Sequence, residues 1–263
     1  MRPPADAVEQ AATRSPLVVG PAFSDLADAD ELRFREQIEP ARDDPEDVAA
    51  WIERKELRRK LRYALQQAGV APAGTVVELG AGSCWLAAEL ALSPEVERVV
   101  AIEFSRYRLE RLAPTALAYL GAPAEKVERV LADFYNHGLA AGCADMVFTD
   151  AAFHHAADPV RFARVAFDLL RPGGTFVAFR EPTLSLLRRR RDHGVEDDHG
   201  SFEHEYFARE YLDHLRSAGF DASRAPAAGG FRTPLQRALL SPPLAWLNGV
   251  LFSEFTYVGR RPA

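Results

Sequence analysis

Residues 76–87 read VVELGAGSCWLA, an apolar run followed by two closely spaced glycines and a second apolar run. The first run is rich in valine and suits a buried strand, and the residues from Cys84 onward suit a helix. Gly80 and Gly82 permit a tight turn in which the backbone approaches a ligand at points where a Cβ atom would collide with it. The stretch therefore predicts a strand, a ligand-binding turn and a helix.

Further short apolar runs alternate with helical patterns along the chain. Such alternation builds a mostly parallel sheet with helices on both faces, so the predicted fold class is α/β, a Rossmann-like doubly wound sheet. The strands are expected at residues 75–79, 98–103, 127–133, 145–150 and 174–180, and the helices at 84–92, 106–119 and 159–170. FTYVGR, residues 255–260, is expected to add a last strand.

The chain is expected to form one domain with an N-terminal extension. Its 263 residues, 48% of them hydrophobic, suit a single large core within residues 46–263. Residues 1–45 show no sustained period, so we expect a partly ordered extension there. From Pro45 onward the apolar residues lie on one side of a helix that Gly69 closes.

Two further segments follow the fifth predicted strand. A charged loop leads into the amphipathic pattern AREYLDHLRSAGF, which predicts a helix that covers the sheet. An apolar stretch at 226–252, broken by prolines, predicts a helical insertion over the crevice or the core. Trp51 in the N-terminal helix and Trp246 in the insertion would together roof the pocket, or else lie in plain core. The insertion is alternatively a contact in a homodimer.

Charge and cysteine content narrow the function classes. The 38 acidic residues exceed the 32 basic ones, and a net charge of −6 gives no general attraction to nucleic acid or anionic lipid. Cys84 and Cys143 form no metal-binding pattern, which fits free thiols in a reducing compartment. The N-terminal residues lack the apolar core of a signal peptide. We therefore expect a cytoplasmic protein without stable membrane insertion and without a nucleic-acid partner.

Acidic residues end four of the predicted strands. They are Glu78, Glu103, Asp133 and Asp150. In open α/β sheets ligands bind beyond the carboxyl ends of the strands, so these carboxylates are expected to ring one crevice. Two cofactors use such a glycine turn, a dinucleotide and S-adenosylmethionine. A dinucleotide fingerprint needs a third glycine where this chain has Trp85, whereas Glu103 could accept hydrogen bonds from the ribose of either cofactor.

Five blocks in register resemble the class I S-adenosylmethionine-dependent methyltransferases. They are VVELGAGSC, AIEFS, LADFYN, ADMVFTDAAFHHAADP and LRPGGTFVAFREP, and they cover roughly residues 70–185. The resemblance implies the fold of that family, a sheet of about seven strands with a reversed last strand. It also implies S-adenosylmethionine as the cofactor and S-adenosylhomocysteine as its product. The Tyr-x-x-x-Lys pair usual in short-chain oxidoreductases is absent from the sequence.

The resemblance assigns cofactor contacts residue by residue. The cofactor-binding residues that it implies are Glu78, Gly80, Ala81, Gly82, Glu103, Phe104, Asp133, Phe134 and Asp150. The backbone of the turn and Glu78 would hold the methionine end, and Glu103 would accept from two ribose hydroxyls. The two phenylalanines would border the adenine, and Asp133 would accept from its amino group. Asp150 would border the methionine moiety or the substrate. Cys84 departs from the family, many of whose members have a third glycine there.

His154 and His155 follow the fourth predicted strand, at the substrate end of the expected crevice. A neutral histidine can take a proton from a hydroxyl or keep an amine neutral, so both are candidate catalytic bases. Neighbouring residues on a helix face different directions, so at least one of the two is expected to be a packing histidine.

The candidate substrate-binding residues are Arg180, Glu181, His204 and Tyr206. An Arg-Glu pair at a strand end is as often a structural ion pair as a substrate clamp. Residues 193–204 include several histidines and carboxylates, but their spacing matches no metal site, so we expect a solvated loop and no metal ion. The arginine run 188–191 is likewise expected to be solvated surface rather than a phosphate contact.

These observations lead to one expected function and three alternatives. We expect an S-adenosylmethionine-dependent methyltransferase that modifies an oxygen, or else a nitrogen, of a small molecule such as a sugar-containing or secondary metabolite. The alternatives are a cofactor-binding protein of the same fold without transfer activity, an NAD(P)-dependent oxidoreductase and a nucleic-acid methyltransferase.

Overall fold

The computed structural model describes residues 2–27, 29–33, 36–37, 40, 43–184, 204–225 and 254–263. Its strands are β1 (Leu17–Val19), β2 (Gly74–Leu79), β3 (Val96–Glu103), β4 (Val127–Leu131), β5 (Ala144–Asp150), β6 (Leu170–Leu184), β7 (Tyr206–Phe207), β8 (Asp221–Ala225) and β9 (Glu254–Arg260). Its helices are α1 (Ala5–Arg14), α2 (Ala29–Arg33), α4 (Asp47–Arg54), α5 (Leu57–Ala68), α6 (Trp85–Ala91), α7 (Ala113–Leu120), α8 (Pro159–Leu169) and α9 (Ala208–Ser217). Shorter helical segments are η2 (Arg108–Leu112), η3 (Ala124–Lys126) and η4 (Phe153–His155).

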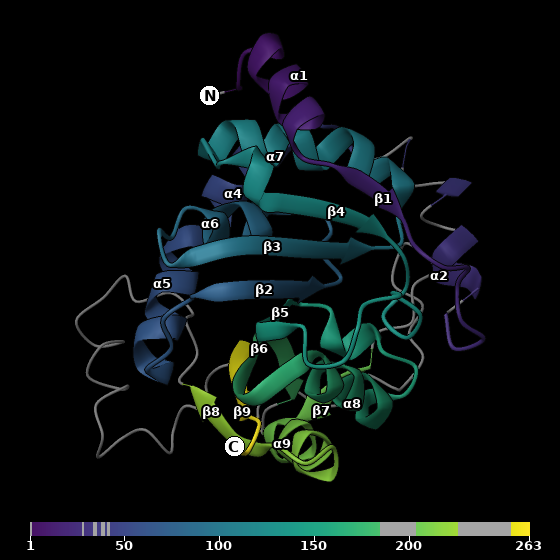
Figure 1. Ribbon diagram of the computed structural model, residues 1–263, viewed down its shortest axis with the longest axis vertical. Coiled ribbons are helices and arrows are strands. Elements are labelled where there is room, and N and C mark those ends of the chain that lie inside the picture. The colour runs from purple at the N-terminus through teal and green to yellow at the C-terminus, as the bar shows by residue number, and fades with distance from the viewer. Residues whose placement is uncertain are drawn as a thin grey trace.

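The strands form one sheet in the order β1-β4-β3-β2-β5-β6-β9-β8, with β7 attached to β6 (Figure 1). From β1 to β6 the neighbouring strands are parallel, whereas β9 is antiparallel to both β6 and β8. The predicted α/β sheet with a reversed last strand is confirmed, and FTYVGR lies in that strand. The nine strands among the described residues exceed the expected number because the N-terminal segment adds β1 and the segment before α9 adds β7.

Alternating side chains along the central strands divide the core into two layers. Val76 and Val99 belong to an apolar cluster with helices α1, α4, α5, α6 and α7, while Val77 and Val100 belong to a second cluster with α8 and α9. Successive residues of a strand point to opposite faces, so each central strand contributes to both layers. The continuous apolar runs in the sequence are therefore strands buried on both faces.

The single helix expected after Pro45 is in fact two helices, so this prediction is wrong. Helix α4 ends at Arg54 and α5 begins at Leu57, and Glu56 between them adopts a left-handed φ of 53°. Ile52 and Leu57, on either side of the break, are buried in the same apolar cluster. The change of direction lets both helices reach this cluster, and neither glycine nor proline marks it in the sequence.

The N-terminal segment takes part in the fold. Helix α1 lies against α7, and β1 pairs with β4 (Figure 1). Arg129 of β4 is 4% exposed and donates to the backbone oxygens of Ala12, Ser15 and Leu109. The segment in which the sequence predicts a partly ordered extension thus contains a helix and an edge strand.

The predicted insertion at 226–252, the arginine run 188–191 and all of the charged loop before His204 lie outside the described residues. Within the described part of the chain, none of the helices is long and apolar enough to cross a membrane.

Candidate functional site

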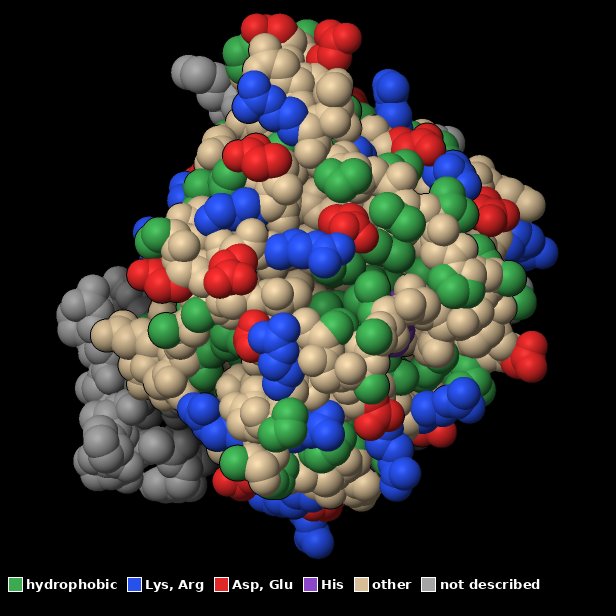
Figure 2. Space-filling view, in the orientation of Figure 1, with side chains coloured by type: hydrophobic (Ala, Val, Ile, Leu, Met, Phe, Trp, Pro, Cys, Tyr) green, Lys and Arg blue, Asp and Glu red, His purple; other side chains and the backbone are tan. Residues whose placement is uncertain are grey.

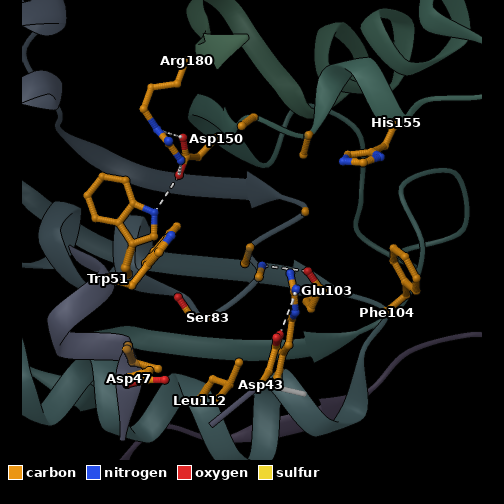
Figure 3. A pocket seen from close by; sticks show the side chains of 18 of the residues that line it. Asp43, Asp47, Trp51, Ser83, Glu103, Phe104, Leu112, Asp150, His155 and Arg180 are labelled. Atoms are coloured by element: carbon orange, nitrogen blue, oxygen red, sulfur yellow. Dashed lines mark hydrogen bonds and ion pairs between the residues drawn. The ribbon is translucent and has the colours of Figure 1, made fainter. Parts of the chain in front are cut away.

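A cavity of about 410 Å³ opens at the carboxyl ends of β2, β3 and β5. Glu103 and Asp150 border it from the sheet, and Trp51 borders it from α4 (Figure 3). The space-filling view shows apolar side chains around a hollow on the face in view, with a histidine visible inside it (Figure 2). Ligand pockets usually measure roughly 300–1,000 Å³, so the cavity has the size of a small-molecule site.

The glycine turn forms one wall of the cavity. Gly80 has a φ of 72°, and a Cβ atom there would lie 2.8 Å from the Cβ atom of Ala152, so no larger residue fits. The N–H groups of Gly80 and Ala81 both donate to Ile102 O over 2.9 Å, which anchors the turn to β3. Gly82 follows with a φ of 53° and also borders the cavity. The backbone of all three residues is therefore held where a ligand can approach it.

Cys84 stands where many members of the resembling family have a third glycine, and its side chain lies in the core and does not border the cavity. The residue keeps a left-handed φ of 57° at the start of α6, and its side chain is fully buried in the apolar cluster. Burial raises the pKa of the Cys84 thiol well above its ordinary value, so the thiol stays neutral. The departure from glycine therefore adds packing in the core and leaves the cavity side of the turn open.

Glu103 fixes the turn and faces the cavity at the end of β3. Its Oε2 atom accepts from Gly82 N over 2.7 Å, and its Oε1 atom accepts from Ser105 N over 2.9 Å. A carboxylate has about four acceptor positions, so two remain for hydroxyl groups of a ligand. Arg108 and Asp43 form an ion pair nearby, with nitrogen and oxygen 3.2 Å apart, and both residues line the same cavity (Figure 3).

Two side chains hold Asp150, which borders the cavity at a distance from Glu103 (Figure 3). Arg180 donates through Nε and Nη2 to the two carboxylate oxygens, each over 2.7 Å, and Trp85 Nε1 donates to Oδ2 over 2.6 Å. Only 5% of the Asp150 side chain and 10% of the Arg180 side chain are exposed. Bidentate pairs of this kind orient both groups, so the two residues form a fixed wall of the cavity.

The two candidate bases have different surroundings. His155 borders the cavity, whereas His154 is 4% exposed and does not. His154 Nδ1 lies 2.9 Å from Glu181 Oε2, and the two histidine rings are 4.2 Å apart between centroids. The expectation that one of the pair is a packing histidine fits His154, and His155 is the one that a bound molecule would meet.

Glu181, a candidate substrate-binding residue, is fully buried and borders neither described cavity. Its oxygens accept from the N–H groups of Ala152, Phe153 and His154 over 3.1–3.2 Å. Burial raises the pKa of Glu181 to about 8, although these N–H groups oppose the shift. The Glu181 carboxyl group therefore contacts the turn after β5 and does not border the cavity.

Asp133 lies just beyond β4, beside a second cavity of about 30 Å³ that Phe104 and Phe134 also border. Ser24 of the N-terminal segment donates to Asp133 through both its N–H and its hydroxyl group. The N–H groups of Tyr135 and Asn136 donate to the same carboxylate. This second cavity is much smaller than the main one, about 30 Å³ against about 410 Å³. Phe104 and Phe134 also line the main cavity, where a ring has space.

Glu78 is buried within the sheet and does not border the main cavity. Neither of its carboxyl oxygens has a hydrogen-bond partner within the described residues. Burial, and after it the nearby Asp150 carboxylate, raises the pKa of Glu78 well above its ordinary value. Of the four strand-end acids expected in one crevice, Glu103 and Asp150 thus meet there, while Asp133 borders the small neighbouring cavity.

His204 and Tyr206 lie together at the edge of the sheet, and neither borders a described cavity. Their rings are stacked with centroids 6.2 Å apart, and His204 N donates to His154 O over 3.2 Å. Burial raises the pKa of Tyr206 to about 12. No group of three or more His, Cys, Asp or Glu side chains that could hold a metal ion occurs among the described residues, and His193 to Glu203 lie outside them.

Several residues of the cavity were not identified from the sequence. Asp43, Asp47 and Arg108 line it, and so does Trp51, which was expected at the roof. Asp43 lies before α4 and Asp47 is the first residue of that helix, and neither belongs to a recognised motif; Arg108 lies in η2. Asp43, Asp47 and Arg108 are recognised as cavity residues only from their positions in the three-dimensional structure.

These features fit the cofactor that the resemblance implies. The glycine backbone forms a cradle that a Cβ atom would fill, and Glu103 presents a carboxylate to any diol beside it. Phe104 and Phe134 add aromatic faces to the same cavity, suited to contact with a nucleobase. The cavity therefore offers an acceptor for a ribose diol, aromatic faces for a base, and a turn whose backbone a ligand can approach closely.

Comparison with known proteins agrees with this interpretation. A family model described as a methyltransferase domain matches residues 77–178. No curated protein sequence matches the chain significantly. Solved structures share the fold. A Haloferax volcanii structure described as a complex with the Trm112 methyltransferase activator is 20% identical, with a TM-score of 0.59 over 82% of this chain and 98% of that one.

Two further structures are S-adenosylmethionine-dependent methyltransferases by description. SibL is 20% identical, with a TM-score of 0.58 over 81% of this chain and 56% of its own. A Mesorhizobium loti enzyme is 21% identical, with a TM-score of 0.52 over 74% of this chain and 94% of its own. The matched methyltransferase domain contains the glycine turn, Glu103, Asp150 and His155. Residues 77–178 thus match a methyltransferase domain, and the chain shares the fold of solved S-adenosylmethionine-dependent methyltransferases.

Proposed function

We propose that the protein is an S-adenosylmethionine-dependent methyltransferase that acts on an oxygen, or else a nitrogen, of a small molecule that binds beside His155. The observation that carries the proposal is a single cavity lined by the glycine turn, Glu103 and His155. Its volume of about 410 Å³ suits a cofactor with the reactive part of a small acceptor rather than a nucleic-acid strand. The net charge of −6 also disfavours an RNA or DNA acceptor.

The chain's own residues would divide cofactor binding between them. The backbone of Gly80 to Gly82 would face the methionine end, and Glu103 would accept hydrogen bonds from the ribose hydroxyls through its remaining lone pairs. Phe104 and Phe134 would border the base. Bound S-adenosylmethionine supplies a methyl group already activated by its sulfonium sulfur, so the protein's main task is positioning.

The acceptor side would consist of His155 and the pair formed by Asp150 and Arg180. An attacking hydroxyl must lose its proton during methyl transfer, and a neutral imidazole at the cavity wall can accept it. An amine needs only to be neutral, so a histidine matters less for it. The presence of His155 in the wall therefore favours oxygen over nitrogen as the acceptor atom.

Small-molecule methyl transfer can be tested with methyl-labelled S-adenosylmethionine and a fractionated metabolite extract. We expect a low-molecular-weight compound to gain the label and the mass of one methylene group, and His155→Ala to reduce the rate by about 100-fold or more. His137→Ala is the matched control, because His137 borders neither cavity. Cofactor binding without any labelled compound would instead support a binding protein, and label in RNA or DNA would support a nucleic-acid methyltransferase.

The cellular location is also a proposal. Cys84 and Cys143 are both free thiols. Free thiols persist in reducing compartments, so a cytoplasmic location is consistent with them.

A further inference from the structure

Two residues beside the cavity have unusual backbone conformations. Ala151, directly after β5, and Arg180, within β6, have φ values of 49° and 54°, although neither is a glycine. Ala151 N donates to Phe179 O over 2.8 Å, so the two strained positions belong to one connected corner. Left-handed non-glycine residues are uncommon, and they cluster at functional sites when the surrounding contacts hold them in place.

Successive side chains of β6 supply those contacts from two directions. The pairing of β6 with β9 shifts register between Ala178 and Glu181, a bulge that re-aims the side chains on either side of it. The Arg180 side chain borders the cavity and donates two hydrogen bonds to Asp150, the last residue of β5 (Figure 3). Glu181 instead reaches the residues that follow Asp150. Together the two side chains hold the whole corner from Asp150 to His154.

The Glu181 carboxyl group accepts hydrogen bonds from three successive backbone N–H groups. They belong to Ala152, Phe153 and His154, at distances of 3.2, 3.1 and 3.2 Å. The same group lies 2.9 Å from His154 Nδ1. His154 in turn lies against His155, with 4.2 Å between the ring centroids. An unbroken series of contacts therefore leads from Glu181 to the cavity wall.

A fully buried carboxyl group is costly, by several kcal/mol for the charged form, so burial alone does not explain its presence. A leucine of similar size would fill the space but would leave three backbone donors and a ring nitrogen unsatisfied. The group thus determines the path of the turn from Ala152 to His155. That path decides which histidine faces the cavity.

We propose that Glu181 is a positioning residue: it holds the turn of residues 152–155 so that His155 faces the acceptor and His154 stays buried. This role differs from the direct substrate contact expected for Glu181 from the sequence. It rests on the proposed function insofar as His155 serves the acceptor. The arrangement of the two histidines can be measured without any acceptor.

Diethyl pyrocarbonate is a suitable probe, because it modifies accessible neutral imidazoles and mass spectrometry of peptides can assign each site. In the wild type we expect rapid modification of His155, slow modification of His154, and protection of His155 by S-adenosylhomocysteine. Glu181→Gln leaves only one acceptor oxygen for the turn. We expect Glu181→Gln to speed the modification of His154 by about tenfold, because one or two hydrogen bonds to the turn are lost. We also expect S-adenosylhomocysteine to protect His155 less well in this variant.

The matched control is Thr183→Val, on the same strand. Thr183 is 2% exposed, and its hydroxyl lies 2.9 Å from Tyr257 Oη and donates to the Glu181 backbone oxygen over 3.1 Å. The variant therefore also loses buried hydrogen bonds but keeps every contact of the Glu181 carboxyl group. We expect it to lose stability but to keep the wild-type pattern of modification. Glu181→Asp withdraws the carboxyl group by one methylene and provides the second test where Glu181→Gln does not fold; the same change in pattern is expected.

Two results would overturn the positioning role: an unchanged ratio of His154 to His155 modification in the Glu181 variants, or an equal change in Thr183→Val. Unfolding curves under the same conditions establish that each variant is folded when it is labelled. Failure of the wild type to bind S-adenosylhomocysteine would count against the proposed function. The modification ratio is read without that ligand, so the two failures are distinguishable.

Discussion

At the scale of single residues, two buried carboxyl groups differ in their hydrogen-bond partners and therefore in the structural role that each can have. Glu78 and Glu181 are both fully buried, and burial raises the pKa of each. Glu181 accepts from three backbone N–H groups, whereas neither oxygen of Glu78 has a partner within the described residues. The first group therefore holds a defined turn. The second is a carboxyl group beneath the site whose pKa is raised by burial and by the nearby Asp150 carboxylate, while the Ala87 backbone opposes the shift.

The raised pKa of Glu181 gives protein stability a defined pH dependence. Burial raises this pKa from 4.5 to about 8, so the folded state binds an extra proton between these two values. The contribution to stability is full below the unfolded pKa and is lost as the pH rises through the folded one. We expect the free energy of unfolding of the wild type, relative to Glu181→Gln, to fall with pH by at most about 1.4 kcal/mol per unit. Urea unfolding across this window measures it, and a difference that rises with pH would contradict the assignment.

The two cysteines should differ in reactivity. Cys84 is fully buried and Cys143 is partly exposed, and burial raises the pKa of both thiols, more strongly for Cys84. Thiolates are the reactive form, so we expect a thiol reagent to label Cys143 slowly and Cys84 only after unfolding. Counting labelled thiols with and without denaturant checks this. Equal labelling of both in the folded protein would show that Cys84 is not packed in the core.

At the scale of elements, the central strands were predictable and one helix boundary was not. Apolar runs bounded by glycine or acidic residues predicted β2, β3, β4 and β5 to within a few residues, because strands buried on both faces must be apolar throughout. The break between α4 and α5 has no such signal. It occurs at Glu56, and tertiary packing of the two helices, rather than local propensity, produces it.

The attachment of α1 and β1 to the sheet depends on Arg129. Its guanidinium group donates to Ser15 Oγ and to three backbone oxygens, at distances of 2.5–3.1 Å. Arg129→Met keeps the apolar stem but leaves these acceptors unsatisfied, so we expect a loss of about 3 kcal/mol or more in the free energy of unfolding. We also expect faster amide hydrogen exchange in α1.

Arg98→Met on the neighbouring strand is the control for this prediction. The Arg98 side chain is 53% exposed and pairs with Glu128, so its loss should cost no more than about 1 kcal/mol. Equal losses in the two variants would show that the N-terminal segment does not depend on Arg129.

At the scale of the whole molecule, the site joins one wall that the sequence predicts to another that it predicts only in part. The rule that ligands bind at the carboxyl ends of parallel strands correctly brings Glu103 and Asp150 to the cavity. It does not separate them from Glu78, which lies one residue before the end of β2 and stays within the buried sheet. The facing wall comes from Trp51, which the sequence suggested as part of the roof, and from Asp43, which no motif marks. Their approach depends on how the N-terminal helices cross the sheet, which no local pattern encodes.

The most direct test of the account is calorimetric titration of the protein with S-adenosylhomocysteine. We predict that the wild type binds it, and that Glu103→Ala weakens binding by about 100-fold or more, because two hydrogen bonds to a carboxylate are lost. Glu97→Ala, an exposed position on the same strand, should bind as the wild type does. A wild-type protein that gives no binding, or a Glu103→Ala variant with unchanged affinity, would contradict the central claim that this cavity holds the cofactor.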